Sequence, residues 1–200
     1  MSLIELVNNA KTDKNTVHSY LDLYQSLLEH KKTTATNVLE IGVAEGGSIK
    51  LWYDFFPNAT IHGVDIQNMD HVWHEIRDKD RIRLYSRDAY DSEFVMQTFL
   101  SPSPTELESK NATWRAQCFD LVVDDGPHSL QSMLDFIRLY SPLLKDDGIL
   151  IIEDVQSDDW LDVLRDHVPA HLKECTRVYD LRTNKHRYDD LVFVLDKSLL

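Results

Sequence analysis

Short apolar runs alternate with amphipathic repeats along most of the chain. Residues 149–152 are wholly apolar, which favours a strand in a sheet buried on both faces. Before them, Leu130, Met133 and Ile137 recur at helical spacing, and Asp147-Gly148 is predicted to end that helix. Strands that alternate with helices indicate a parallel sheet, with strands predicted at residues 37–41, 60–65, 81–88, 119–123 and 149–152.

The two ends of the chain depart from this alternation. Val17, Tyr20, Tyr24 and Leu28 lie at helical spacing and predict an amphipathic helix across the edge of the sheet. Near the C-terminus, two apolar runs flank a polar turn, as expected of a β-hairpin. We predict one α/β domain whose mostly parallel seven-stranded sheet ends in this antiparallel hairpin and carries helices on both faces. Its parts are a helical preface (1–36), a Rossmann-like core (37–200) and, within the core, the hairpin strands (176–181 and 191–195).

Composition restricts the classes of partner. A chain of 200 residues with 42% hydrophobic content is long enough for one domain with a well-buried core and too short for two such domains. Its net charge of −13 would repel a polyanion, so nucleic acid is excluded and a neutral small molecule or sugar is favoured. Without a long apolar run or a signal-peptide pattern, we expect a cytoplasmic protein with no membrane contact. Residues 101–117 are predicted to be a surface insertion or part of a lid.

A glycine-rich turn follows the first predicted strand. Glu40 ends the apolar run, Gly42 allows a tight turn, Gly46 and Gly47 leave room for a ligand, and Ser48 is predicted to cap the next helix. This pattern indicates a nucleotide-type cofactor site at the carboxyl end of a parallel strand. The second and third strands also end in acids, Asp65 and Asp88, of which the first suits a ribose diol.

Acidic residues follow the fourth and fifth strands as well. Asp125 and the pair Glu153-Asp154 are expected to meet at one rim of the sheet, where they would repel one another without a cation between them. Oxygen ligands without sulfur favour Mg²⁺, Mn²⁺ or Ca²⁺ over zinc. His128 lies one turn beyond Asp125 and is a candidate general base. The alternative is that these acids cap helices and the histidine packs on the sheet.

These motifs resemble class I S-adenosylmethionine (SAM) methyltransferases, and the chain as a whole resembles the metal-dependent sugar O-methyltransferases of the macrolide deoxysugar type. The match includes the Thr12-Asp13-Lys14 segment and departs from the family at Pro127, where a small polar residue is expected. The resemblance implies SAM binding by Thr12, Lys14, His18, Tyr20, Glu40, Gly42, Ser48, Asp65, Ile66, Asp88, Ala89 and Asp124, a Mg²⁺ site at Asp125, Glu153 and Asp154, and His128 as the base.

The predicted reaction is methylation of a sugar hydroxyl, in a deoxyhexose such as rhamnose that is free or part of a glycan. Larger members of the resembled family have an extra N-terminal domain that helps to form the substrate site and the oligomer. The resemblance therefore predicts neither the acceptor nor the oligomeric state of this chain. It would also suit one domain of a larger glycan-building enzyme. Three alternatives stay open: a catechol-type O-methyltransferase, a dehydrogenase, and a non-catalytic SAM-binding module.

Overall fold

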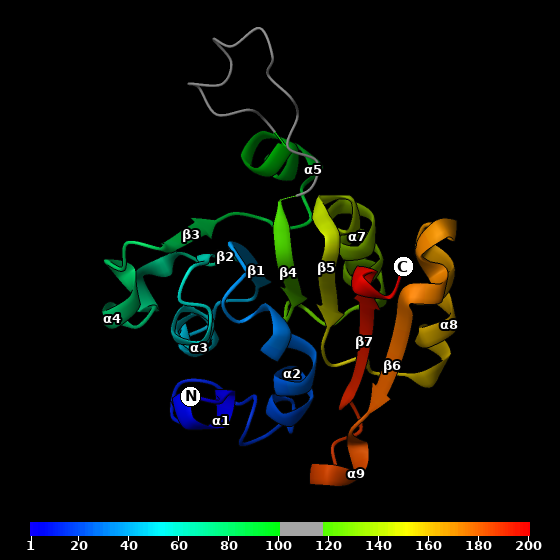
Figure 1. The fold of residues 1–200 in the computed structure, drawn as a ribbon, viewed down its shortest axis with the longest axis horizontal. Helices are drawn as coiled ribbons and strands as arrows, with labels where there is room; N and C mark the ends of the chain where they lie inside the picture. Colours follow the sequence, from blue (N-terminus) through cyan, green and yellow to red (C-terminus); the bar gives the residue numbers. More distant parts are fainter. Residues whose placement is uncertain (101–117) are drawn as a thin grey trace, which may run out of the picture.

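The computed structural model describes residues 1–100 and 118–200, so the predicted insertion at 101–117 lies outside the described residues. A seven-stranded sheet crosses the molecule in the order β3-β2-β1-β4-β5-β7-β6 (Figure 1). Its first five strands are parallel and β7 is antiparallel to both β5 and β6. The predicted mostly parallel sheet with a C-terminal hairpin is therefore confirmed. The strands are β1 (Asn37–Ile41), β2 (Thr60–Asp65), β3 (Ile82–Ser86), β4 (Phe119–Asp124), β5 (Leu144–Ile152), β6 (Thr176–Asp180) and β7 (Leu191–Asp196).

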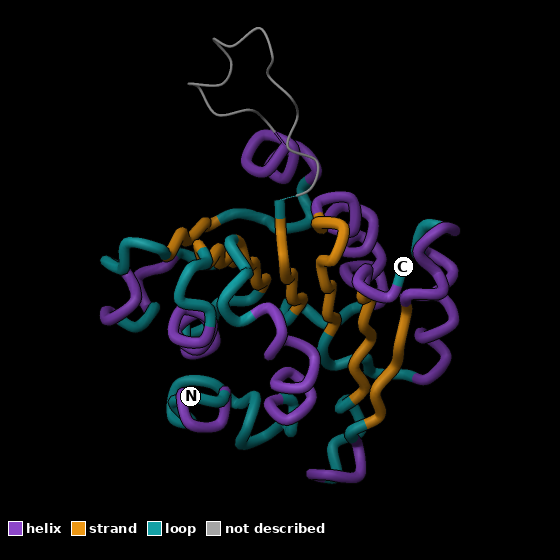
Figure 2. Tube along the Cα trace, viewed as in Figure 1, coloured by secondary structure: helices purple, strands orange, loops and turns teal. Residues whose placement is uncertain are grey.

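Side chains alternate between the two faces of the sheet, and each face buries its own apolar cluster. Val38 and Ile61 pack with the N-terminal helices, whereas Leu39 and Val64 pack with later helices on the other face. Figure 2 shows helices on both sides of the strands. The first face carries α1 (Leu3–Leu6), α2 (Leu21–Leu28), α3 (Gly47–Phe55) and α4 (His74–Arg77); the second carries α5 (Ser92–Val95), α7 (Leu130–Tyr140) and α8 (Asp158–His167).

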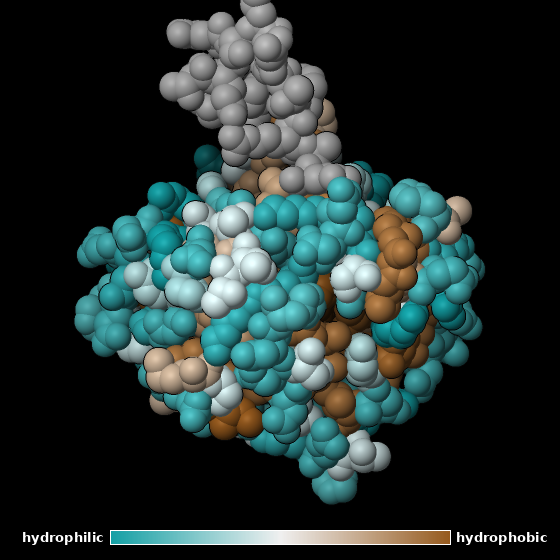
Figure 3. All heavy atoms as spheres, in the orientation of Figure 1, coloured by the Kyte–Doolittle hydropathy of each residue, from teal (hydrophilic) through white to brown (hydrophobic). Residues whose placement is uncertain are grey.

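Short helical turns complete the connections. Most are 3₁₀ turns, and the segment after α5 is π-helical. Hydrophilic residues cover most of the face shown in Figure 3, and hydrophobic ones gather mainly on the side of β6 and β7. Within the described ranges, none of the helices has the length and apolarity to cross a membrane. The turns are η1 (Glu29–Lys31), η2 (Met69–His71), η3 (Met96–Leu100), η4 (Ser141–Leu143), η5 (Ala170–Cys175) and η6 (Lys197–Leu199), and the short α-helix α9 (Arg182–Lys185) lies between β6 and β7.

The boundary between α7 and β5 differs from the prediction. The helix ends at Tyr140, and Pro142 lies in the 3₁₀ turn that follows. Strand β5 already begins at Leu144, and its register against β4 shifts between Phe119 and Leu121. The polar residues before Gly148 therefore form an irregularity inside the strand rather than the end of a helix. Residues in a β-bulge are not paired with the neighbouring strand, so polar side chains can be accommodated there.

The N-terminal segment crosses the edge of the sheet at the carboxyl ends of the parallel strands. In Figure 1, α1 and α2 lie at the end toward which β4 and β5 point. Helix α2 is shorter than predicted, since Val17 is exposed in the preceding turn and the helix starts at Leu21. Likewise β3 ends at Ser86, which places Asp88 in the following loop. Residues 8–20 thus form an irregular wall over this edge.

Candidate functional site

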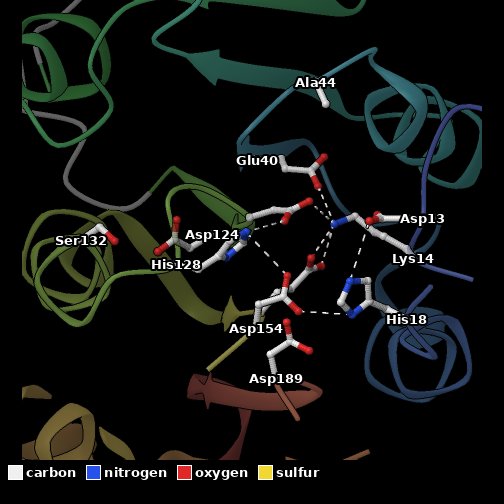
Figure 4. Close-up of polar contacts among 12 residues, drawn as sticks. Asp13, Lys14, His18, Glu40, Ala44, Asp124, His128, Ser132, Asp154 and Asp189 are labelled. Atoms are coloured by element: carbon white, nitrogen blue, oxygen red, sulfur yellow. Dashed lines mark hydrogen bonds and ion pairs between the residues drawn. The ribbon is translucent and has the colours of Figure 1, made fainter. Parts of the chain in front are cut away.

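The carboxyl ends of β1, β4 and β5 bring the predicted acids together. The parallel register places Ile41 beside Asp124 and Asp124 beside Ile152. The acidic residues among the last residues of these strands or just after them therefore meet at one rim, as Figure 4 shows for Glu40, Asp124 and Asp154. Because this edge lies between β1 and β4, where the strand order reverses, it is the usual position of a ligand site in an open α/β sheet.

The glycine-rich turn is built for close chain contact. Gly42 has φ +86°, and a Cβ there would overlap the backbone oxygen of Asp125. A Cβ at Gly46 would instead overlap the side chain of Ile76, and one at Gly47 would overlap the backbone of Lys11. The last two glycines therefore make room for the protein's own chain, and Gly47 also lines the smaller of the two cavities described below.

The helix after this turn begins differently from the prediction. Its N-cap is Gly46, and Ser48 lies buried inside the first turn of α3 without capping it. The turn is stabilised by Asp65, whose Oδ2 accepts hydrogen bonds from the backbone N–H of Val43 (2.9 Å) and of Ala44 (3.4 Å). Asp65 Oδ1 accepts one from Gln67 N–H at 2.9 Å. The Asp65 carboxylate is thus held by backbone N–H groups of the loop that follows β1 and of the loop that follows β2.

Two cavities lie along this edge. One of about 760 Å³ runs from the ends of β2 and β3 past β4 and β5 to the connection before β7. A second, of about 340 Å³, lies between residues 9–16 and the glycine-rich turn. Their volumes suit a small-molecule ligand. Of the predicted cofactor residues, the larger cavity is lined by His18, Gly42, Asp65, Ile66, Asp88 and Ala89, and the smaller by Thr12, Gly42 and Ser48.

Four predicted cofactor residues line neither cavity: Lys14, Tyr20, Glu40 and Asp124. All four are buried. Asp124 accepts a hydrogen bond from the Tyr90 hydroxyl at 2.6 Å, and burial raises its pKa to about 7 against that hydrogen bond. These residues therefore lie beneath the ligand space and support its walls.

Lys14 is the cation that separates the carboxylates at the rim. Its Nζ lies 2.8 Å from Asp125 Oδ2, 2.6 Å from Glu153 Oε2 and 3.1 Å from Glu40 Oε1, and its side chain is 1% exposed (Figure 4). Burial opposes the charge of this ammonium, but the three carboxylates outweigh it and raise its pKa. Glu153 also accepts a hydrogen bond from Tyr24, so Lys14 and Tyr24 already occupy its oxygens.

A second buried network lies beside Asp154. His18 Nδ1 is 2.6 Å from Asp190 Oδ1 and 3.3 Å from Asp154 Oδ1, and the Tyr20 hydroxyl donates to Asp154. Burial raises the pKa of Asp154, while Tyr20 and His18 oppose the rise. Through these contacts the N-terminal segment is joined to the ends of β5 and β7.

His128 faces the remaining oxygens of the acidic rim. Its Nε2 lies 3.7 Å from Asp125 Oδ1 and 3.6 Å from Asp154 Oδ2, and its side chain is 29% exposed. Ligand atoms of Asp125, His128 and Asp154 all lie within 4.8 Å of one another, a spacing that can hold a metal ion. The two hard carboxylates suit Mg²⁺ or Mn²⁺, and the imidazole of His128 lies beside them. Glu153, the third predicted ligand, faces Lys14 instead of this group.

Sequence reasoning missed the acids and the arginine that precede β7. Arg187 and Asp189 line the larger cavity, and Asp190 pairs with His18. They lie in the polar stretch between the hairpin strands, whose composition indicates only a turn. Tyr24 was placed by helical spacing alone, which gives no sign of its contact with Glu153.

Comparisons with known proteins agree with this architecture. A family model described as a methyltransferase domain matches residues 39–155. The chain is 28% identical over 151 residues to the mycinamicin VI 2''-O-methyltransferase of Micromonospora griseorubida, a match that covers 72% of this chain and 33% of that protein. It is 26% identical over 156 residues to the 8-demethyl-8-alpha-L-rhamnosyl tetracenomycin-C 2'-O-methyltransferase of Streptomyces olivaceus, covering 74% of this chain and 36% of that one. The chain thus spans about a third of the length of these relatives.

A solved structure extends the likeness to nearly the whole chain. The MycE methyltransferase from the mycinamycin biosynthetic pathway, in complex with Mg, SAH and mycinamycin VI, matches with a TM-score of 0.68 and 23% identity. The match covers 98% of this chain and 54% of that one, and it establishes a Rossmann-like methyltransferase fold. Because the family model covers residues 39–155 of a 200-residue chain, the chain belongs to the methyltransferase domain family.

Proposed function

We propose that the protein is a SAM-dependent, metal-assisted O-methyltransferase that acts on a sugar hydroxyl. The observation that carries the proposal is the larger cavity, which has Asp65 and Asp88 at one end and the group of Asp125, His128 and Asp154 farther along the same edge. A ribose-binding acid and a cation-binding rim that share one cavity suit a methyl donor and an oxygen acceptor side by side. The sugar O-methyltransferases among the relatives support this choice.

The cofactor would lie between the two cavities. Asp65 would bind the ribose and Asp88 would lie beside the adenine, and Ile66, which is 74% exposed, would offer an apolar surface to the adenine ring. The methionine end of SAM would extend past Gly42 toward Thr12 and Ser48 in the smaller cavity. Lys14, Tyr20, Glu40 and Asp124 would support this site from below without touching the cofactor.

A divalent ion would be held by Asp125 and Asp154, beside His128. When bound, such an ion makes a coordinated hydroxyl more acidic and fixes its position. Glu153 is the third candidate ligand, and it would have to exchange its contacts with Lys14 and Tyr24 for the ion. The donor set fits Mg²⁺, and Mn²⁺ or Ca²⁺ would find the same oxygens.

His128 supplies the base in this mechanism. In the neutral form its Nε2 would take the proton of the acceptor hydroxyl, at a point 3.7 Å from Asp125 Oδ1 and 3.6 Å from Asp154 Oδ2. The acceptor oxygen then forms a bond to the methyl carbon as the sulfur–methyl bond breaks, which converts the sulfonium to a neutral thioether. Because the positive charge passes from the sulfonium to the His128 imidazole and no anion remains, alignment of the acceptor by the cavity walls matters more than stabilisation of an anion.

The acceptor would be a small molecule or a glycan, with a deoxyhexose such as rhamnose favoured by the rhamnosyl relative. Since the chain spans about a third of its curated relatives, it would suit one domain of a larger glycan-building enzyme. The acidic composition, with a net charge of −13, supports exclusion of nucleic acid as a substrate. A cytoplasmic location fits the supply of SAM.

A methyl-transfer screen tests the proposal. The purified protein, SAM and Mg²⁺ are mixed with neutral deoxyhexosides, with catechols and with no acceptor, and products are read by mass. Transfer to a sugar that stops in EDTA supports the proposal. Transfer to catechols alone would assign the aromatic class of acceptor, and SAM binding without any transfer would indicate a non-catalytic module.

A further inference from the structure

The connection between β6 and β7 contributes a polar pair to the far end of the larger cavity. Because β7 lies next to β5, residues 186–190 reach the rim beside Asp154. Arg187 and Asp189 line the cavity there, on the opposite side of the acidic rim from the ends of β2 and β3. A cofactor held at Asp65 and Asp88 would therefore leave this end free.

Arg187 and Asp189 form an ion pair with unused hydrogen-bonding capacity. The Nη2 atom of Arg187 lies 2.8 Å from Asp189 Oδ2. Asp189 is 8% exposed, and its Oδ1 has no hydrogen-bond partner among the described residues. The same holds for Arg187 Nε. A buried donor and a buried acceptor without partners are unusual in a folded protein and indicate a missing ligand or water.

Two other buried atoms that lack a hydrogen bond are explained by ion pairs, and a third, Asp190 Oδ2, belongs to the acid beside Asp189 that pairs with His18 through its Oδ1. Lys31 Nζ lies 2.7 Å from Asp147 Oδ2, and Glu40 Oε1 lies 3.1 Å from Lys14 Nζ. Asp189 Oδ1 and Arg187 Nε have no such partner within the part of the chain that the structure describes. The unused capacity is therefore concentrated at the end of the cavity where the acceptor would lie.

The surrounding charge selects the chemistry of the ligand. Asp13, Asp154 and Asp189 line this cavity, and Arg187 is its sole lysine or arginine among the described residues. An acceptor group with a negative charge would be repelled by these acids, and the charge of Arg187 is already balanced by Asp189. A hydroxyl group is neutral, and it can donate to Asp189 while a neighbouring oxygen accepts from Arg187.

We infer that Arg187 and Asp189 bind neighbouring hydroxyl groups of a neutral acceptor sugar and so determine which acceptors are methylated. The inference rests on the proposed function, because it concerns the acceptor end of the same cavity. These two residues would orient the sugar, while His128 acts on the hydroxyl that is methylated. Their loss should therefore weaken acceptor binding far more than SAM binding.

The test uses Asp189→Asn and Arg187→Gln, with Arg187→Lys as a conservative variant. Methyl α-L-rhamnoside is the first probe, and the best neutral sugar from the acceptor screen is the second. Each variant should raise KM for the sugar about ten- to hundredfold, the usual worth of hydrogen bonds to charged groups, with a smaller change in kcat. The affinity for S-adenosylhomocysteine, measured by calorimetry, should stay at the wild-type value. Arg187→Lys should recover part of the sugar affinity.

Arg182→Gln is the matched control, because Arg182 lies in the same connection and pairs with Asp180 and Asp158 outside both cavities. It should leave KM unchanged. If the wild-type protein methylates a sugar and Asp189→Asn does so with unchanged KM, the inference is wrong while the proposed function stands. A preference for a glucuronide over the neutral sugar would also overturn it. If no sugar is methylated at all, the proposed function itself fails.

Discussion

Replacement of Lys14 by methionine removes the buried cation at the rim and keeps a side chain of similar length. The ammonium has three carboxylate partners, with Nζ to oxygen distances of 2.6 Å to Glu153, 2.8 Å to Asp125 and 3.1 Å to Glu40. Glu40 and Glu153 are 0% and 1% exposed, so water cannot replace the lost partner. We therefore expect the largest stability loss of any single charge removal at this site.

The magnitude follows from the cost of leaving a buried charge unpaired. Removing one partner of a buried ion pair costs about 3–5 kcal/mol. For a domain of this size, this lowers the melting temperature by about 6–20 °C. Burial raises the pKa of Glu153 and Lys14 opposes the rise, so in Lys14→Met that pKa should increase further. A raised folded pKa of a carboxyl destabilises the protein above the unfolded pKa, so the deficit should be small near about pH 4 and should grow as the pH rises toward neutral.

Urea unfolding of the wild type, Lys14→Met, Glu153→Gln and the double variant measures this coupling. The double variant should be more stable than Lys14→Met, because it no longer buries an unpaired Glu153 carboxylate. Lys11→Met is the control, since Lys11 pairs with the exposed Glu45 and should change stability by less than about 1 kcal/mol. A Lys14→Met protein as stable as the wild type at neutral pH, or strictly additive losses in the double variant, would refute this account.

Three further perturbations address cofactor, base and pH. Asp65→Ala should weaken SAM binding in calorimetry without unfolding the protein, and unchanged affinity would count against the ribose assignment. His128→Ala should bind SAM and Mn²⁺ normally but lose on the order of 10²–10⁴-fold in kcat, less at high pH where hydroxide substitutes for the base; a wild-type rate would make His128 structural. Burial lowers the pKa of His62 from 6.5 to about 4, so about 3 kcal/mol of stability should be lost as pH falls through that window. His62→Gln should remove this loss in acid-unfolding measurements, and an unchanged acid profile would reject it.

The strand-end acids could be predicted because register is a local consequence of hydrophobic pattern. Apolar runs of similar length place Glu40, Asp65 and Asp125 at corresponding ends of parallel strands, and the structure brings them to one edge. The bulge in β5 could not be predicted in the same way. Asp146, Asp147 and Gly148 have the composition of a turn, and only pairing with β4 reveals that the strand continues through them.

The contacts of the N-terminal segment could not be predicted from the sequence, because they depend on tertiary structure. Lys14, His18 and Tyr20 were recognised as part of one motif and assigned to the cofactor, but two of the three lie beneath the cavities. Whether a side chain lines a site or supports it depends on the path of residues 8–20 over the sheet, which has no periodic pattern. The role of Arg187 and Asp189 could not be predicted for the same reason, since the composition of a polar turn does not show whether the turn lies at a cavity.

The position of Lys14 also separates the roles of the neighbouring acids Glu153 and Asp154. Both are predicted to bind the metal. Glu153, however, forms an ion pair with Lys14, whereas the ligand atoms of Asp154, Asp125 and His128 lie within 4.8 Å of one another. Removing a ligand weakens metal binding more than removing the partner of an internal cation. In a Mn²⁺ titration followed by electron paramagnetic resonance, Asp154→Asn should therefore lose most of the affinity and Glu153→Gln should retain more. Equal losses in the two variants would show that Lys14 releases Glu153 when the ion binds and that all three acids hold it.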